Sequence, residues 1–96
     1  MTSNGFPPAL PHSGSTLQVS ALDSIGRPIN LDPARYRFDV SPLTLAGFYV
    51  VTPSSNTVLG VTVIQAAPSV PITWKLTDLS LARIVVGPTT TNVQLQ

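Results

Sequence analysis

Apolar residues occupy every second position over much of the chain, beginning near residue 16. From Tyr36 to Val40, aromatic and aliphatic side chains alternate with charged ones, which predicts a strand with one buried face and one solvent-exposed face. The same period of two recurs over residues 17–21, 59–63 and 70–76. No segment shows sustained helical periodicity, and the ten prolines disfavour long helices. The pattern therefore predicts an all-β protein.

Turn-forming residues separate the apolar stretches. Asp23–Pro28 contains an acidic residue, a glycine and a strand-stopping proline, and Ser41-Pro42 and Gly87-Pro88 interrupt the pattern further along. Residues 46–52 are apolar almost throughout, which predicts a strand buried on both faces. About seven short strands at this spacing favour a β-sandwich or a small barrel. The predicted strands cover residues 16–22, 35–40, 46–52, 57–65, 72–77, 79–86 and 91–95.

Residues 1–15 lack this alternation. They contain three prolines and two glycines, and they predict an extended N-terminal arm that precedes a β-sandwich domain over residues 16–96. Two interpretations of the arm are open. It is either a disordered tail or a segment that lies on a neighbouring subunit, with Phe6 and Leu10 as apolar anchors.

The segment Leu17–Ile29 carries a more specific pattern, in which an alternating strand meets the sequence Asp-Ser-Ile-Gly-Arg-Pro-Ile. It resembles the opening of bacterial immunoglobulin-like domains, where such a strand runs into an Asp-x-x-Gly-x-Pro-Ile turn. The resemblance implies an immunoglobulin-like β-sandwich over residues 16–86 and a role in adhesion or in decorating a surface. Solitary sandwiches of this kind also occur as decoration and cement proteins on phage heads and tails.

Trp74 departs from this resemblance. Immunoglobulin-like domains that carry a core tryptophan usually have it early, on a central strand, whereas Trp74 comes late in the chain. Its phase still matches that of Val70 and Ile72, which alternate with polar residues. We therefore expect Trp74 to be a core residue and not a platform for a ligand.

The side chains that catalysis and metal binding require are scarce. The chain has one histidine, one lysine, four aspartates, no glutamate and no cysteine, whereas proton transfer, covalent catalysis and metal binding draw mainly on these types. His12 has no second histidine or cysteine to complete a metal site, and the aspartates lack the close spacing of calcium loops. We therefore expect no catalytic, metal-binding or cofactor-binding residues and no enzymatic activity. Asp23, Asp32 and Asp78 are predicted to be turn or cap residues.

Charge is sparse and scattered. Charged residues make up 9% of the chain, with a net charge of +1, against about 25% in typical soluble domains. The five basic residues form no run, so we expect no nucleic-acid partner. No apolar stretch is long enough to insert into a membrane, and the first residues lack the basic and apolar regions of a signal peptide. So few charges indicate that a partner, or copies of the chain itself, covers much of the surface.

These observations favour a structural subunit. We expect a homo-oligomer, or a subunit that attaches to a larger protein lattice such as a phage capsid or tail, and hence a location in the virion. The alternative is an immunoglobulin-like adhesion or filament module, either extracellular or at a cell surface. Thr91–Leu95 is expected to add a strand to an open sheet edge of a neighbour. The residues expected to make the interface contacts are Phe6, Leu10, Val93 and Leu95.

Overall fold

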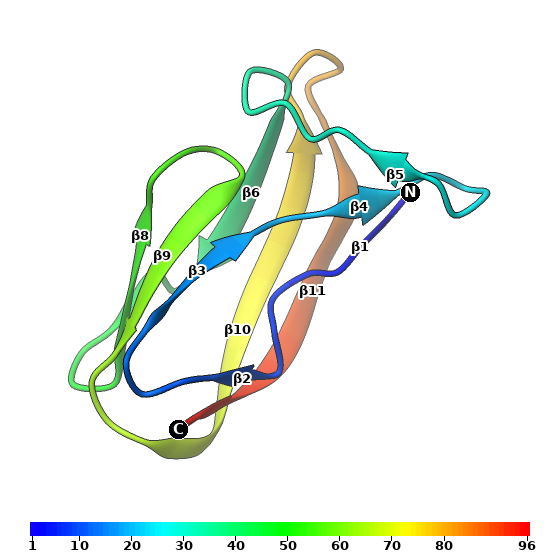
Figure 1. The fold of residues 1–96 in the computed structure, drawn as a ribbon. Helices are drawn as coiled ribbons and strands as arrows, with labels where there is room; N and C mark the ends of the chain where they lie inside the picture. The colour runs from blue at the N-terminus through cyan, green and yellow to red at the C-terminus, as the bar shows by residue number, and fades with distance from the viewer.

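A computed structural model of the chain describes residues 1–96 and shows an all-β protein. Eleven strands and no helix are present, which confirms the all-β prediction. Two four-stranded sheets face each other across a shared apolar core, and a smaller three-stranded sheet extends to one side (Figure 1). The strands are β1 (Thr2–Ser3), β2 (Ala9–Leu10), β3 (Ser15–Gln18), β4 (Ala21–Leu22), β5 (Pro28–Ile29), β6 (Tyr36–Ser41), β7 (Thr44–Leu45), β8 (Tyr49–Pro53), β9 (Val58–Val63), β10 (Ala67–Asp78) and β11 (Arg83–Leu95).

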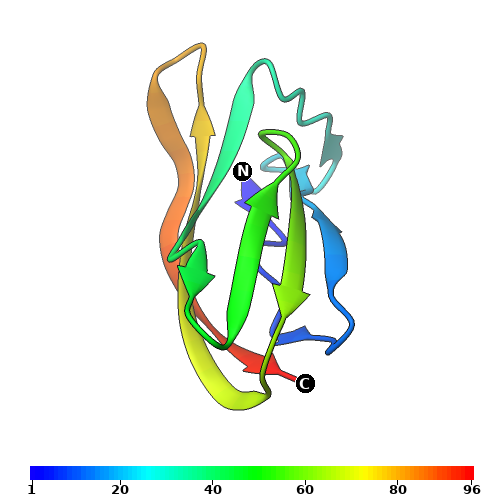
Figure 2. The same cartoon turned by 90° about the vertical axis from the view of Figure 1, so that its left-hand side faces the viewer.

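The two larger sheets form the layers of the molecule. The first has the strand order β2-β11-β10-β6, and the second has the order β3-β9-β8-β7. Neighbouring strands run antiparallel in both, except that β2 runs parallel to β11. The third sheet has the order β1-β4-β5. Seen from the side, the larger sheets lie as separate layers, so the fold is sandwich-like (Figure 2).

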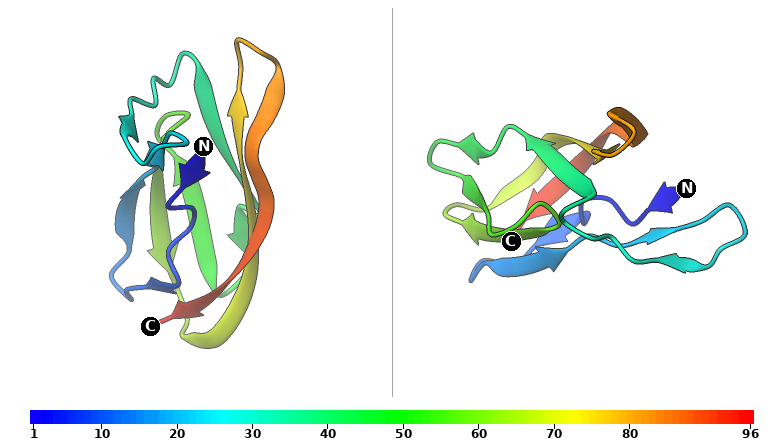
Figure 3. Two further views of the ribbon diagram at one scale, coloured as in Figure 1. Left: turned by 90° about the vertical axis from the view of Figure 1, so that its right-hand side faces the viewer. Right: turned by 90° about the horizontal axis from the view of Figure 1, so that it is seen from above.

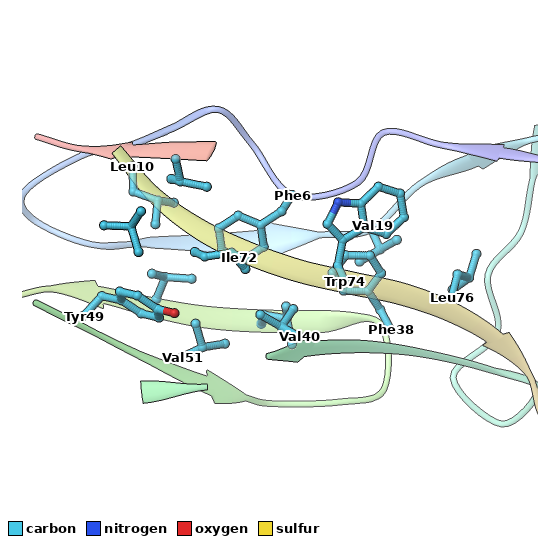
Figure 4. Packing of buried hydrophobic residues seen from close by; sticks show 14 of the residues in the cluster. Phe6, Leu10, Val19, Phe38, Val40, Tyr49, Val51, Ile72, Trp74 and Leu76 are labelled. Carbon is cyan, nitrogen blue, oxygen red and sulfur yellow. The ribbon is translucent and has the colours of Figure 1, made fainter. Parts of the chain in front are cut away.

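The period of two in the sequence places the core between these layers. β6 buries Tyr36, Phe38 and Val40, as predicted, and β10 buries every second side chain from Val70 to Leu76. Side chains from both sheets meet in the interior, where Trp74 lies close to Phe38 (Figure 4). The buried apolar residues are Phe6, Leu10, Val19, Ala21, Leu31, Tyr36, Phe38, Val40, Tyr49, Val51, Leu59, Val61, Val63, Val70, Ile72, Trp74, Leu76, Val93 and Leu95.

Strand boundaries differ from the prediction in several places. Gly87-Pro88 does not end a strand, because β11 continues through it with a register shift against β10. Residues 79–82 form a turn instead of a strand, since the Asp78 carboxylate binds backbone amides of the turn. β8 begins at Tyr49 and is buried on one face, not on both. Five of the eleven strands have two residues each, so the expected count of about seven is not matched.

Residues 1–15 are part of the folded domain. β1 pairs with β4, and β2 pairs with β11, so the segment between them crosses from the small sheet to the first large one (Figure 3). Phe6 and Leu10 are buried in the core. The segment is extended, as predicted, but the expected boundary between an arm (1–15) and a domain (16–96) does not appear. Its apolar side chains fill the gap between the sheets of their own chain.

Candidate interaction surfaces

The four residues expected to make intersubunit contacts lie in the core instead. Their exposed fractions are 3% for Phe6, 1% for Leu10, 0% for Val93 and 2% for Leu95. The physical reason is that β2 docks beside β11 of the same chain, with Leu10 in register with Leu95. These side chains therefore stabilise the sandwich, and none of them lies at the surface of the folded chain.

A different apolar surface lies at the turn between β10 and β11. Leu81 is 54% exposed and Ile84 is 44% exposed, and both line a shallow depression with a volume of about 480 Å³. We call this depression the hairpin-end surface. Exposed apolar side chains that cluster in this way mark interaction sites more often than isolated ones do. The residues that line it are Met1, Arg35, Tyr36, Asp78, Leu81, Arg83, Ile84 and Val85.

The carboxylate of Asp78 is hydrogen-bonded to this turn from the buried side. Asp78 is buried, and its Oδ1 accepts hydrogen bonds from the Ser80 hydroxyl at 2.7 Å, the Ser80 amide at 3.0 Å and the Leu81 amide at 3.1 Å. Its Oδ2 accepts a hydrogen bond from Arg35 Nη2 at 3.2 Å. The Ser80 hydroxyl, and after it the Leu81 amide and Arg35, lowers the pKa of Asp78, while burial opposes this shift. Leu81 is thus presented on a turn that is fixed from within.

The two arginines that line the hairpin-end surface differ in whether they form an ion pair. Arg35 is paired with Asp78, and the hydrogen bond that Arg35 donates to the Asp78 carboxylate is the main cause that raises the pKa of Arg35. Arg83 is exposed and forms no ion pair. One guanidinium group is therefore free beside exposed Leu81 and Ile84. The hairpin-end surface therefore combines exposed apolar side chains with one unpaired positive charge.

The alternating pattern alone does not predict the hairpin-end surface. Leu79–Val86 has the apolar composition of a strand, and the sequence therefore predicts one there. The signal that could have revealed the turn is Asp78 followed two residues later by Ser80, because both side chains bind local backbone amides in turns. Asp78 is thus one of the turn residues that the sequence predicts.

The other two predicted turn aspartates also bind local backbone. Asp23 Oδ1 accepts hydrogen bonds from the amides of Ile25 and Arg27, and the Arg27 amide is the main cause that lowers the pKa of Asp23. Asp32 Oδ1 accepts a hydrogen bond from the Ala34 amide at 2.9 Å. Both aspartates shape loops, and the prediction of turn residues is confirmed.

The remaining polar groups assemble no recognisable reaction centre. A second depression, of about 450 Å³, lies on the outer face of β6 and β10, where Arg37 pairs with Asp39 at 3.0 Å beside Lys75. His12 is exposed in the turn after β2, and no group of three or more His, Cys, Asp or Glu side chains comes together. No helix has the length and apolar character needed to cross a membrane. No protein-family model, curated protein or solved structure matches the chain.

Proposed function

We propose that the chain is a non-enzymatic assembly subunit that attaches to a larger protein lattice, such as a phage capsid or tail, through the hairpin-end surface. The observation that carries this proposal is the exposure of Leu81 and Ile84 on a turn that the buried Asp78 carboxylate holds rigid. A preordered apolar surface loses little conformational entropy on binding. The free Arg83 beside it adds a side-chain type that is enriched at interfaces.

The order of the strands supports an immunoglobulin-like topology for this subunit. In immunoglobulin-like sandwiches, strands A, B, E and D form one sheet, and strands C, F and G form the other. If β3, β6, β8, β9, β10 and β11 are taken as B, C, D, E, F and G, the two large sheets read B-E-D and G-F-C. The N-terminal segment then corresponds to strand A, because it pairs with β4 through β1 and with β11 through β2.

The low charge of the chain supports a role in assembly. Eight large apolar side chains are exposed, while charged residues make up 9% of the sequence. A surface with so little charge is poorly suited to standing alone in water, because monomeric soluble domains normally carry more charge and smaller apolar patches. Attachment to a lattice would remove part of this apolar area from water.

A second candidate function is an adhesion or filament module at a cell surface. The observation that favours it is the position of the chain ends, since the N-terminus and the C-terminus lie toward opposite ends of the sandwich (Figure 1). Domains with this arrangement can follow one another in a long chain without folding back. In such a filament, the hairpin-end surface would meet the next domain.

Co-sedimentation with assembled particles tests the first proposal. The purified chain is mixed with particles formed by the capsid or tail protein that is encoded beside it. We expect the chain to sediment with the particles, Leu81→Ser to weaken binding, and the matched control Ile25→Ser, at a 70% exposed site outside the hairpin-end surface, to bind like the parent. A chain that stays in the supernatant, or equal binding by both variants, would contradict the proposal. Neighbouring genes for wall or filament proteins would favour the second candidate.

A further inference from the structure

Three of the five basic residues are paired with an aspartate of the same chain. The pairs are Arg27 with Asp23, Arg35 with Asp78, and Arg37 with Asp39. Lys75 and Arg83 form no ion pair. Of these two, Arg83 alone lines the hairpin-end surface, where the side chains of Leu81 and Ile84 are exposed beside it.

Arg83 has no partner within the chain because the carboxylate opposite it is already engaged. Asp78 is the residue that faces Arg83 in the ladder between β10 and β11. Its Oδ1 accepts three hydrogen bonds from the turn, and its Oδ2 binds Arg35. The fourth aspartate, Asp32, accepts the amide hydrogen of Ala34, and the chain has no glutamate. A carboxylate side chain that pairs with Arg83 would therefore come from another molecule.

The positive charge of the hairpin-end surface is centred on Arg83. The charged side chains that line this surface are Arg35, Arg83 and Asp78. The Arg35 guanidinium lies 5.3 Å from the centroid of the Tyr36 ring and donates a hydrogen bond to Asp78, so it is held on both counts. Asp78 balances one of the two guanidinium groups, and the charge of Arg83 is left over.

We propose that Arg83 determines the specificity of the hairpin-end surface by binding an aspartate or glutamate side chain of the protein to which the chain attaches. Leu81 and Ile84 then contact apolar side chains that flank this carboxylate. The inference rests on the proposed attachment through the hairpin-end surface, and it adds the chemistry of the partner.

The residue types at this surface suit a carboxylate. A guanidinium group can donate two parallel hydrogen bonds to the two oxygens of one carboxylate, which fixes the direction of approach. Leu81 and Ile84 would exclude water from the contact, and charges that are shielded from water are screened less by salt. Complementary charges of this kind set the register of an interface and disfavour wrong partners.

Two other classes of partner fit the charge less well. Recognition of anionic lipids uses clusters of about 4–8 basic residues, and nucleic-acid binding spreads basic residues along many phosphates. The hairpin-end surface has one unpaired basic side chain. Lys75, the other unpaired one, lines the separate depression on the outer face of β6 and β10. A single carboxylate between apolar side chains matches the single charge of Arg83.

Neutral variants of the two unpaired basic residues test the role of Arg83. Arg83→Gln and the matched control Lys75→Gln change the net charge of the chain equally, and circular dichroism checks that both fold. Co-sedimentation with the particles described above, over a concentration series of the chain, measures affinity. We expect Arg83→Gln to bind about tenfold more weakly than the parent, and Lys75→Gln to bind like the parent. Equal affinities of the two variants would overturn the inference.

Blocking the carboxylates of the particles tests the partner's side of the pair. Treatment with a carbodiimide and ethanolamine converts exposed aspartate and glutamate side chains to neutral amides, and electron microscopy checks that the particles stay intact. We expect the parent to bind treated particles about as weakly as Arg83→Gln binds untreated ones. The treatment should change the binding of Arg83→Gln little. An equal loss for the parent and for Arg83→Gln would place the important carboxylates elsewhere and refute the inference.

These outcomes separate the inference from the proposed function. If the parent binds the particles and Leu81→Ser weakens binding, while Arg83→Gln and the amide treatment have no effect, the attachment holds and the carboxylate partner is wrong. If the parent does not bind the particles, both are wrong. Binding of the parent to vesicles of phosphatidylserine and phosphatidylcholine, and not to the particles, would assign the hairpin-end surface to a membrane and overturn both.

Discussion

The indole ring of Trp74 stacks on the phenyl ring of Phe38, with ring centroids 5.4 Å apart and ring planes inclined by 26°. Trp74 lies on β10 and Phe38 on the neighbouring strand β6, so the stack holds adjacent strands of one sheet together inside the core. Trp74 also donates its indole hydrogen to Thr91 on β11. The side chain of Trp74 therefore links three strands of this sheet.

Loss of either ring should destabilise the fold strongly. Phe38→Ala and Trp74→Ala each leave a cavity in a packed core, and we expect the free energy of unfolding to fall by about 3–5 kcal/mol. Urea unfolding followed by far-ultraviolet circular dichroism measures this. The control is Ile25→Ala, whose side chain is exposed in the turn between β4 and β5, and it should cost less than about 0.5 kcal/mol. A similarly small cost at both aromatic positions would show that their side chains are not packed as described.

Gly5 provides a test of how the N-terminal segment docks. Its φ is +64°, and a Cβ placed there would overlap the indole ring of Trp74. Gly26 also has a positive φ, +84°, but a Cβ there meets no atom within 4 Å. Gly26→Ala should cost about 1–2 kcal/mol from backbone strain alone, and Gly5→Ala should add about 1–3 kcal/mol for overpacking. Fluorescence of the single tryptophan should change in Gly5→Ala but not in Gly26→Ala; equal spectra and stabilities would argue against the docked segment.

Deletion of residues 1–10 should unfold or strongly weaken the domain. A free arm could be removed without harm, but this segment contributes Phe6 and Leu10 to the core. Each of these side chains is worth about 1.5–3 kcal/mol when fully buried, against a total of about 5–15 kcal/mol for a typical domain. Thermal unfolding of the truncated chain beside the intact one measures the loss. If the truncated chain and the intact chain unfold at the same temperature, the segment is not part of the core in solution.

Acid should loosen the turn between β10 and β11. The pKa of Asp78 is lowered in the folded state, so its carboxylate contributes stability above the unfolded pKa of about 3.9, and this contribution is lost as the pH falls through the lower folded value. Asp78→Asn should therefore reduce stability at neutral pH and weaken its dependence on pH in the acid range. Urea unfolding at several pH values measures both effects.

The exposed pair of Arg37 and Asp39 supplies the control for this experiment. The two side chains are 47% and 37% exposed, and surface ion pairs contribute about 0–1 kcal/mol. Asp39→Asn should thus leave the pH profile of unfolding close to that of the parent. An Asp78→Asn profile that also keeps the full acid dependence would show that Asp78 does not carry it.

The local alternation of apolar and polar residues was enough to predict the central strands. The direction of a side chain in a strand depends only on its position relative to its neighbours, so Phe38 and Trp74 could be assigned to the core from the residues around them. The role of the turn aspartates could be predicted for the same reason, because each of them binds backbone amides only a few residues away. These features need no knowledge of which strands lie side by side.

Features that depend on distant pairing could not be predicted. Phe6 and Leu10 stand among prolines without any period, and their burial follows from the contact of Pro8 with Gln94 at the far end of the chain. Pro88 is a second case. Proline usually ends a strand, but it is tolerated at a sheet edge or a bulge, and only the pairing of β11 with β10 shows that Pro88 lies at a register shift. The hairpin-end surface depends in the same way on the approach of Arg35 to Asp78.

The parallel pairing of β2 with β11 has a mechanical consequence. A pull on the two chain ends draws β2 toward the N-terminus and β11 toward the C-terminus, in opposite directions along the same line (Figure 1). The hydrogen bonds from Gln94 to Pro8 and from Gln96 to Leu10 lie across that line. They are loaded in shear, so they must yield together and not one after another. The sandwich is therefore built to resist stretching at its ends.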